Sequence, residues 1–341
     1  MKAKGFAASA LAMSAAAMMT LGGCGGVDPN ATAAVLNGRN ISAGLLNFAA
    51  QKEAVNYDTY YMPYYGTDMW TSDPENDGST MTDDIRSDAL DELKDMYLLE
   101  EHMGDYNVTI SQEDETAMNA AVDSFFAENT ANALNKMGAT KDIVKEYLRL
   151  ETIQKKVGDA IRDTADKEVS DEEAAQTTIS YYNIVVPEDE DSEEEDSEAM
   201  KVAKDLLAEQ VVTAAKVDFD KVEDDYGLTK LTLSFGMDDE SEDANMIAAV
   251  KKLSEGEVSD LVKTEDEDYW VIRLDSEFDR EATDEKKEEI VSDRQSDLYY
   301  EKLSEYSDAA TWETKDDVIK KINFNTLYQM AYDEEATETA G

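Results

Sequence analysis

The spacing of apolar residues changes twice along the chain, and this change constrains the fold more than any other sequence feature. Between Asp84 and Met103 apolar residues recur every three or four positions, the period of an amphipathic helix. The same period runs from Val144 to Ile161 and returns after Glu281. Between these stretches lie β-branched and aromatic segments such as "TTISYYNIVV", which favour strands. The sequence therefore predicts an α+β protein in which two helical segments flank a compact insert containing strands.

Turn and capping residues divide the first helical stretch. Asn37 and Gly38 form a turn signal, and a helical pattern begins at about Ser42. Further helices are expected to start near Ser111 and after Thr140, which is a suitable N-cap residue. The first part of the chain is therefore expected to be mostly helical.

An aromatic segment follows the first predicted helix. In "NYDTYYMPYYGTDMW" aromatic residues crowd together between Tyr57 and Trp70, and Pro63 is expected to interrupt any helix there. The segment is interpreted as core filler and a loop lid, in preference to a surface that contacts peptides.

The insert is expected to follow the order β-α-α-β-α-β. Ser170 and Glu173 have the spacing of a capping box, after which the first strand begins. Helices are expected over 199–214 and 245–253, with a strand in "LTKLTLSF" between them and a closing strand in "DYWVIRL". Beyond the returning helix, "DDVIKKINF" is expected to form one last amphipathic piece.

The first residues form a candidate export signal. Basic residues in "MKAK" precede an apolar run from Phe6 to Leu21, shorter than the roughly 20 residues that span a bilayer. The small residues of "LGGC" then precede Cys24, the only cysteine. This resembles the bacterial lipobox and predicts a signal peptide over 1–23 with lipidation of Cys24; a plain secretory signal is the alternative. A lipid on Cys24 would hold the protein at the extracytoplasmic face of a bacterial cell membrane and leave no free thiol.

The charge balance limits the expected partners. The 341 residues include 31 basic and 79 acidic ones, a net charge of −48, whereas nucleic-acid binding needs clustered basic side chains. Nucleic acid is therefore not expected as a partner. The acidic run 188–198 lacks the turn glycine of a calcium loop and is interpreted as a solvated loop. His102, the only histidine, is interpreted as a helix-terminal or surface residue. No metal and no cofactor is expected.

The order of these parts resembles one protein family. A lipoprotein signal, a helical segment opening with "AVLNGRNIS", a small α+β insert and a returning helix resemble the PrsA-type foldase lipoproteins, relatives of the chaperone SurA. The most specific part is "MIAAVKKLSEGEVSDLVKTEDEDYWVIRL". The resemblance implies a parvulin-like peptidyl-prolyl isomerase domain inserted into a SurA-like helical chaperone domain. The implied bounds are a signal peptide 1–23, a tether 24–32, a helical domain 33–170, a parvulin-like domain 171–277, a returning helical part 278–330 and an acidic tail 331–341.

The resemblance also implies a pocket, but its residues depart from the family pattern. Asn183 and Trp270 occupy the positions of the two family histidines, and Glu242 stands where the family has a pocket methionine. Phe235 and Met246 match apolar residues of the pocket. Rotation about an X-Pro bond requires no nucleophile, because a pocket complementary to the twisted amide is sufficient. With both imidazoles replaced, the domain is expected to be a weak or inactive isomerase whose pocket is filled by Trp270.

These features predict a membrane-anchored chaperone that assists the folding of secreted proteins. Its partners would be unfolded or partly folded secreted proteins, held by exposed aromatic and methionine side chains of the helical domain. An active isomerase with a rearranged site and a solute-binding lipoprotein are alternatives. The solute-binding class usually has two parallel sheets, which a long helical first third does not fit. A homodimer is compatible with such helical arms.

Overall fold

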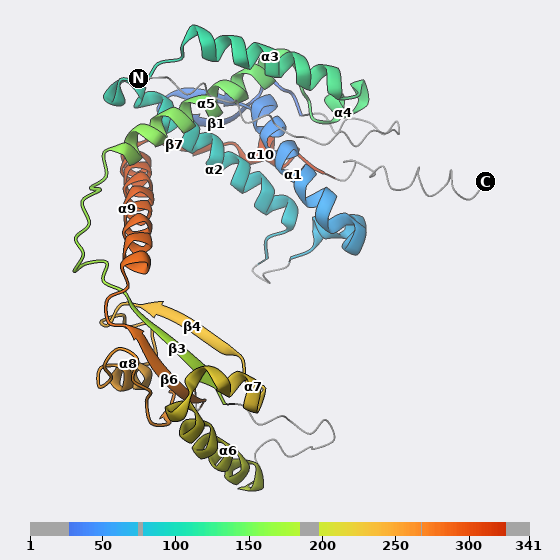
Figure 1. Ribbon diagram of the computed structural model, residues 1–341. Coiled ribbons are helices and arrows are strands. Elements are labelled where there is room, and N and C mark those ends of the chain that lie inside the picture. Colours follow the sequence, from blue (N-terminus) through green and yellow to red (C-terminus); the bar gives the residue numbers. More distant parts are fainter. Residues whose placement is uncertain (1–26, 74–77, 185–197, 267, 325–341) are drawn as a thin grey trace. The chain divides into compact units, whose positions relative to one another are not determined.

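The computed structural model describes residues 27–73, 78–184, 198–266 and 268–324 (Figure 1). The predicted signal peptide, the lipidation site Cys24, nearly all of the acidic run 188–198 and the tail 331–341 lie outside these ranges. None of the helices within the ranges is long and apolar enough to cross a membrane.

The chain divides into two compact units and has an α+β fold. The helical unit is formed by the described residues within Met1–Thr164 and Ser296–Gly341, and the small unit is Ala165–Gln295. The expected architecture, a mostly helical body with a small α+β insert, is confirmed.

A hairpin opens the helical unit. Strands β1 (Thr32–Leu36) and β2 (Arg39–Ser42) are antiparallel, and φ is positive at both turn residues, Asn37 (50°) and Gly38 (82°). An Asn-Gly pair favours this two-residue turn, so the predicted turn is confirmed. A third strand, β7 (Trp312–Thr314), pairs antiparallel with β1 from the other end of the chain.

Five helices follow the hairpin, and their caps explain where they begin. They are α1 (Ala43–Tyr65), α2 (Met81–Glu101), α3 (Gln112–Glu128), α4 (Ala131–Lys136) and α5 (Lys141–Asp163). The side chains of Ser42, Ser111 and Thr140 each accept a hydrogen bond from the backbone N–H three residues on, at 3.1–3.2 Å. The helix starts predicted from these residues are confirmed. Two 3-10 turns, η1 (Gly66–Thr71) and η2 (Met103–Tyr106), connect helices.

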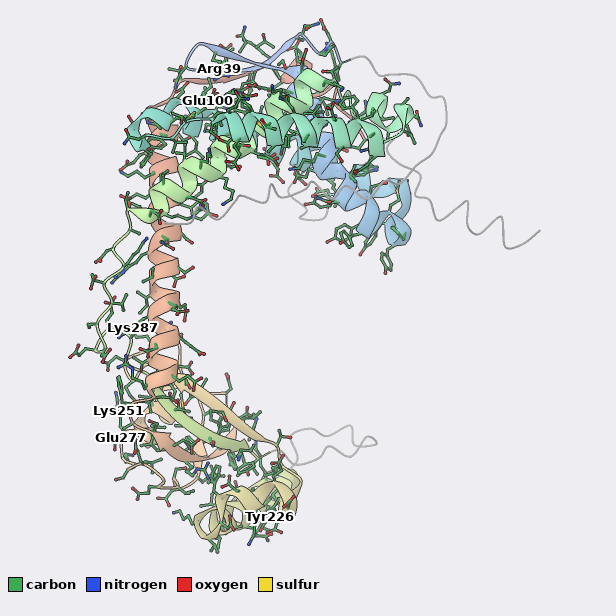
Figure 2. All side chains as sticks on the ribbon, turned by 45° about the horizontal axis from the view of Figure 1, so that its top comes forward. Arg39, Glu100, Tyr226, Lys251, Glu277 and Lys287 are labelled. Carbon is green, nitrogen blue, oxygen red and sulfur yellow. The ribbon has the colours of Figure 1, made fainter. Side chains whose placement is uncertain are left out.

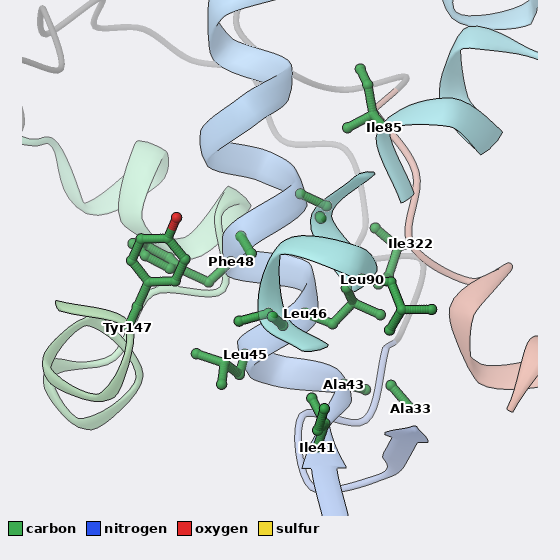
Figure 3. Close-up of a cluster of buried hydrophobic side chains, with 14 of the residues drawn as sticks. Ala33, Ile41, Ala43, Leu45, Leu46, Phe48, Ile85, Leu90, Tyr147 and Ile322 are labelled. Carbon is green, nitrogen blue, oxygen red and sulfur yellow. The ribbon is translucent and has the colours of Figure 1, made fainter. Parts of the chain in front are cut away.

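The C-terminal segment completes the core that α1, α2 and α5 share with the hairpin. Figure 3 shows Phe48 of α1 beside Tyr147 of α5, with ring centroids 5.5 Å apart, and Ile322 packed into the same cluster. Phe324, which follows α10 (Asp316–Ile319), is buried with its ring 5.2 Å from that of Trp70. Residues from both ends of the chain therefore build one core.

A second cluster joins the same two segments. The long helix α9 (Arg280–Ala309) contributes Tyr299 and Leu303 to a cluster with Leu99 of α2 and buried residues of α5. The chain near residue 100 and the chain near residue 300 therefore pack against each other within the helical unit. His102 is the C-cap residue of α2, as expected for a helix-terminal histidine.

A polar contact links the hairpin to α2. Figure 2 shows Arg39 of β2 beside Glu100 of α2, and the guanidinium Nη1 lies 2.5 Å from the carboxylate Oε2. The Arg39 guanidinium also lies 4.2 Å from the ring centroid of Tyr97. The same group thus forms an ion pair with Glu100 and a cation–π contact with Tyr97.

The small unit is a four-stranded antiparallel sheet with helices on both faces. Its strands are β3 (Thr177–Asn183), β4 (Lys230–Phe235), β5 (Val262–Lys263) and β6 (Tyr269–Ser276), in the spatial order β4-β3-β6-β5. Its helices are α6 (Glu198–Val217), the turn η3 (Phe219–Lys221), α7 (Val222–Tyr226) and α8 (Ala244–Val250). The predicted element order is confirmed, with β5 as an additional strand.

Alternation along the strands separates two hydrophobic clusters. Tyr182 and Val271 face α6 and α7, whereas Ile179 and Ile272 face α8. Successive residues of a strand point to opposite faces, so each cluster takes every second residue.

Two local predictions are wrong. Pro63 does not interrupt the first helix, because α1 continues to Tyr65 and ends only at Gly66, where φ is 62°. A proline within the last turn removes one backbone hydrogen bond and leaves the long packed part of the helix intact. Ser170 and Glu173 make the backbone half of the predicted capping contact, at 3.1 Å, but the chain there forms a turn and no helix.

Ion pairs hold the segment before β3 against the first half of α9. Arg280, Lys287 and Arg294 are seven residues apart and therefore lie along one face of the helix. Arg280 and Lys287 both contact the carboxylate of Asp171, and Arg294 contacts Glu173 at 2.5 Å. Figure 2 labels Lys287 on this part of α9.

Candidate functional site

The four residues expected in the parvulin-like pocket lie on one face of the small-unit sheet. Phe235 of β4, Met246 of α8 and Trp270 of β6 belong to the same hydrophobic cluster. Asn183, the last residue of β3, is directly opposite Trp270 in the β3–β6 register. Strand alternation and the position of α8 thus bring together all four predicted positions.

These residues do not have equal access to solvent. Phe235 and Met246 are 2% and 0% exposed, so both are packed in the core. Trp270 is half-buried, and its ring stacks on that of Tyr181 at 4.2 Å between centroids with a 20° interplanar angle. The accessible part of this face is therefore the aromatic pair Tyr181 and Trp270, continued along β4 by Leu231 and Leu233.

Polar groups with no partner border this aromatic pair. The side-chain oxygen of Asn183 and the indole nitrogen of Trp270 are buried and have no hydrogen-bond partner. Asn183 donates through Nδ2 to the Asp268 carboxylate at 3.3 Å, so only its acceptor is unsatisfied. A buried donor or acceptor without a partner costs free energy, which a bound backbone amide could recover.

Glu242 adds an acidic group to the same face. Burial, followed by the nearby charge of Asp239, raises the pKa of Glu242. Burial, followed by the charge of Glu242, raises the pKa of the Tyr181 hydroxyl. A carboxylate thus stands near the aromatic pair, at the position where the family has a pocket methionine. The only histidine of the chain, His102, belongs to the helical unit.

A second candidate site, which we call the tyrosine face, lies on the last turns of α1. Four side chains are exposed there: Tyr60 (70%), Tyr61 (46%), Tyr64 (82%) and Tyr65 (67%). The interpretation of this segment as core filler is wrong for these four residues, although Trp70 in η1 is buried. The signal was present in the sequence, because positions spaced by three and four residues share one side of a helix.

The tyrosines form rows along the helix, with one ring pair stacked and the next tilted. Tyr57, Tyr61 and Tyr65 are four residues apart, and their consecutive ring centroids are 5.8 and 6.4 Å apart. Tyr60 and Tyr64, also four residues apart, form a second row beside the first. A tyrosine presents a large apolar ring at little entropic cost and a hydroxyl that remains solvated, as interaction surfaces require.

The expected contribution of methionine to an exposed surface is wrong for the described residues. Every methionine whose exposure the structure describes is buried or half-buried, including Met62 beside the tyrosine face and Met237 in the small unit. Met69, Met96 and Met137 are core residues of the helical unit. The exposed large apolar side chains of α1 are therefore all tyrosines.

No group of acidic, histidine or cysteine side chains within the described ranges is arranged to hold a metal ion. A hollow of about 630 Å³ lies between α6 and α7, away from the four predicted residues. Tyr226, labelled in Figure 2, and the strongly exposed Val217 are among the residues that line it.

No protein-family model matches the sequence, and no match was found among curated proteins. The chain is similar in structure to the foldase protein PrsA of Lactococcus lactis, with 16% identity over 88% of this chain and 100% of that chain and a TM-score of 0.36. For PrsA of Bacillus cereus the identity is 16%, the covered shares are 87% and 98%, and the TM-score is 0.32. A SurA-like chaperone of Campylobacter jejuni has 13% identity over 84% of this chain and 99% of that chain, with a TM-score of 0.32. The similar solved structures named here are thus PrsA foldases and a SurA-like chaperone, with low TM-scores.

Proposed function

We propose that the chain is a membrane-anchored extracytoplasmic chaperone that assists the folding of secreted proteins. The observation that carries the proposal is the tyrosine face, where four neighbouring tyrosines are exposed on one helix. A contiguous exposed apolar surface on a folded protein indicates an interaction site. Such rings suit a chaperone, because they contact many different apolar side chains without needing a fixed partner shape.

The proposed location is based on the sequence of the first residues. The apolar run before "LGGC" fits an export signal, and Cys24 is the only cysteine available for lipidation. Acylation with more than one chain gives stable membrane binding, whereas one chain binds only marginally. Release of the chain from membranes by Cys24→Ser, with export intact, would support this anchor.

The small unit is proposed to have weak or no isomerase activity. No imidazole stands on its sheet face, and the ring of Trp270 stacks there on that of Tyr181. Phe235 and Met246 are fully packed, so they offer little surface to a proline ring. The unit would then serve as a second binding surface for clients.

Suppression of client aggregation tests the proposal. Light scattering of an aggregation-prone protein diluted from denaturant should fall when the mature chain is added. The double variant Tyr60→Ser with Tyr64→Ser should suppress aggregation less, whereas Tyr300→Ser, which removes a 66% exposed tyrosine of α9, should match the parent chain. Undiminished scattering at several-fold excess of the parent chain would refute the chaperone function.

One observation favours an active isomerase as the second candidate. The unsatisfied oxygen of Asn183 and the unsatisfied indole N–H of Trp270 belong to residues that are opposite each other in the β3–β6 register, and they could bind the amide of an X-Pro bond if a client displaced the groups that cover them. A proline-limited refolding assay distinguishes the two candidates. Acceleration by the parent chain that is lost in Trp270→Phe, which keeps a ring and removes the N–H, would establish the isomerase.

The solute-binding alternative has no comparable support. All strand pairs among the described residues are antiparallel, in sheets of three and four strands. The two parallel sheets usual for that class do not occur in this part of the chain.

A further inference from the structure

We propose that the tyrosine face selects cationic segments of unfolded chains, in which arginine or lysine lies close to apolar residues, over neutral or acidic segments. This inference rests on the proposed chaperone function and names the client chemistry that the site takes. The order of side chains along α1 and the neighbouring surface of α2 both favour such segments.

The aromatic row of α1 continues directly into a carboxylate. Glu53, Tyr57, Tyr61 and Tyr65 are each four residues apart, so they follow one side of the helix. A client side chain that lies along the rings would therefore reach a carboxylate at the end of the row. Arginine suits this arrangement, because its flat guanidinium stacks on aromatic rings and pairs with carboxylates.

The facing side of α2 adds more negative charge. Burial raises the pKa of Tyr57, and the charges of Glu53, Asp88 and Asp84 raise it further, which places these carboxylates around the start of the aromatic row. Asp84 accepts a hydrogen bond from Ser79 at 2.6 Å. For Glu53 and Asp88 the described residues supply no ion-pair partner within 4.0 Å. The aromatic row thus borders two carboxylates, those of Glu53 and Asp88, that form no close ion pair within the described ranges.

Burial and neighbouring carboxylates both disfavour the charged forms of Glu53 and Asp88. Burial, followed by the charges of Asp88 and Glu92, raises the pKa of Glu53 to about 7, and Lys52 lowers it only in part. Burial, followed by Asp84 and Asp91, raises the pKa of Asp88. A bound cation would relieve this repulsion, whereas an acidic client would increase it. The rings alone would bind any apolar segment. The neighbouring carboxylates therefore favour those apolar segments that also carry a positive charge.

Three unstructured peptides with identical apolar residues test the inference. They carry arginine, glutamine or glutamate at the remaining positions, and fluorescence anisotropy measures their binding to the mature chain. The arginine peptide should bind about tenfold more tightly than the glutamine peptide and the glutamate peptide most weakly. Equal affinities for the three peptides would overturn the inference.

Matched variants separate this site from the general negative charge of the chain. Glu53→Gln with Asp88→Asn should weaken binding of the arginine peptide about fivefold to tenfold. Glu301→Gln with Asp308→Asn removes the same charge from exposed positions of α9 and should change affinity less than about twofold. Equal losses in the two double variants would show that only net charge matters and would overturn the inference.

The pH dependence provides a further readout. Because Glu53 becomes protonated as the pH falls through about 7, affinity for the arginine peptide should decrease from about pH 8 to about pH 6, and Glu53→Gln should flatten this change. The other ionisable groups that act on Glu53 or Tyr57, or on which Glu53 acts, are Lys52, Tyr61, Asp84, Asp88, Glu92 and Tyr147, and Asp91 acts in turn on Asp88. An affinity that rises over this range would contradict the assignment.

The outcome also separates this inference from the proposed function. If the chain suppresses aggregation but binds all three peptides alike, the chaperone function stands and the client preference fails. If it binds none of them and aggregation is undiminished, the proposed function itself fails.

Discussion

At the residue scale, Asp58 of α1 is a buried carboxylic acid with an incomplete set of partners. Its side chain is 1% exposed, and Oδ1 has no hydrogen-bond partner. Burial raises the pKa of Asp58 to about 6, although the charge of Lys136 acts in the opposite direction. The folded chain therefore holds a proton that the unfolded chain releases at lower pH, so this group destabilises the fold as the pH rises from about 4 to above 6.

We expect Asp58→Asn to stabilise the protein at neutral pH. The stability that protonated Asp58 provides is fully present below about pH 4 and is lost as the pH rises through about 6. The variant should therefore raise the free energy of unfolding by about 1–2 kcal/mol near neutral pH and change it little near pH 4. Urea unfolding at the two pH values measures this difference. Asp308→Asn, at an exposed position, serves as the control, and an equal effect of Asp58→Asn at both pH values would contradict the explanation.

The residues of the candidate pocket show what a sequence can reveal about single positions. The family resemblance implied that Asn183 and Trp270 belong to one pocket, and in the structure the two residues are opposite each other in the β3–β6 register. The stacking of Trp270 on Tyr181 and the complete burial of Met246 depend on how α8 packs on the sheet. These are tertiary contacts, which no local pattern encodes. The roles of the four residues in binding or catalysis stay predictions.

At the scale of elements, long periodic helices were predictable and short strands were not. The spacing of Val144, Tyr147 and Ile161 defined α5, and all three are buried. Strand β7 has three residues and pairs with β1, from which most of the chain separates it in sequence. Its formation therefore depends on a remote partner. The two-residue strand β5 is equally short. Neither is long enough to show a period.

The end of α1 shows why a local rule gave a wrong prediction. Pro63 favoured a break, and a broken helix would have allowed the tyrosines to fold into the core. Since the helix continues to Tyr65, helical spacing instead keeps Tyr60 and Tyr64 on the exposed side. The effect of a proline therefore depends on how far it lies from the end of its helix. Only the structure showed that Pro63 lies in the last turn of α1.

The ion pairs along the first half of α9 lead to a prediction for the segment before β3. Lys287→Gln removes one of the two cations that hold Asp171 and should speed hydrogen exchange of backbone amides in residues 165–175. Added salt should have the same effect, because exposed ion pairs are screened within about 10 Å at 0.1 M. Lys286→Gln is the matched control, since Lys286 contacts Glu289 within α9. Faster exchange in both variants would indicate a general effect on the helix.

At the scale of the whole molecule, each hydrophobic cluster belongs to one unit. The two clusters of the helical unit draw residues from both ends of the chain, including Leu36, Leu303 and Phe324. The two clusters of the small unit contain only residues between Ile179 and Leu274. The helical unit therefore cannot complete its core until the C-terminal segment has been made, whereas the residues of the small-unit clusters are contiguous in the chain.

This division predicts that one C-terminal side chain controls the stability of the N-terminal helices. Phe324→Ala removes a buried ring that packs against Trp70 and should destabilise the helical unit by about 3–5 kcal/mol. Hydrogen exchange resolved by peptide should then increase in α1 and α2, more than 220 residues earlier in the chain, and remain unchanged in β3 and β6. Phe278→Ala, at a 42% exposed position of the small unit, should change exchange little in either unit. Faster exchange in β3 and β6 of Phe324→Ala would instead mean that both units unfold in one cooperative step, so that the C-terminal segment stabilises the entire chain.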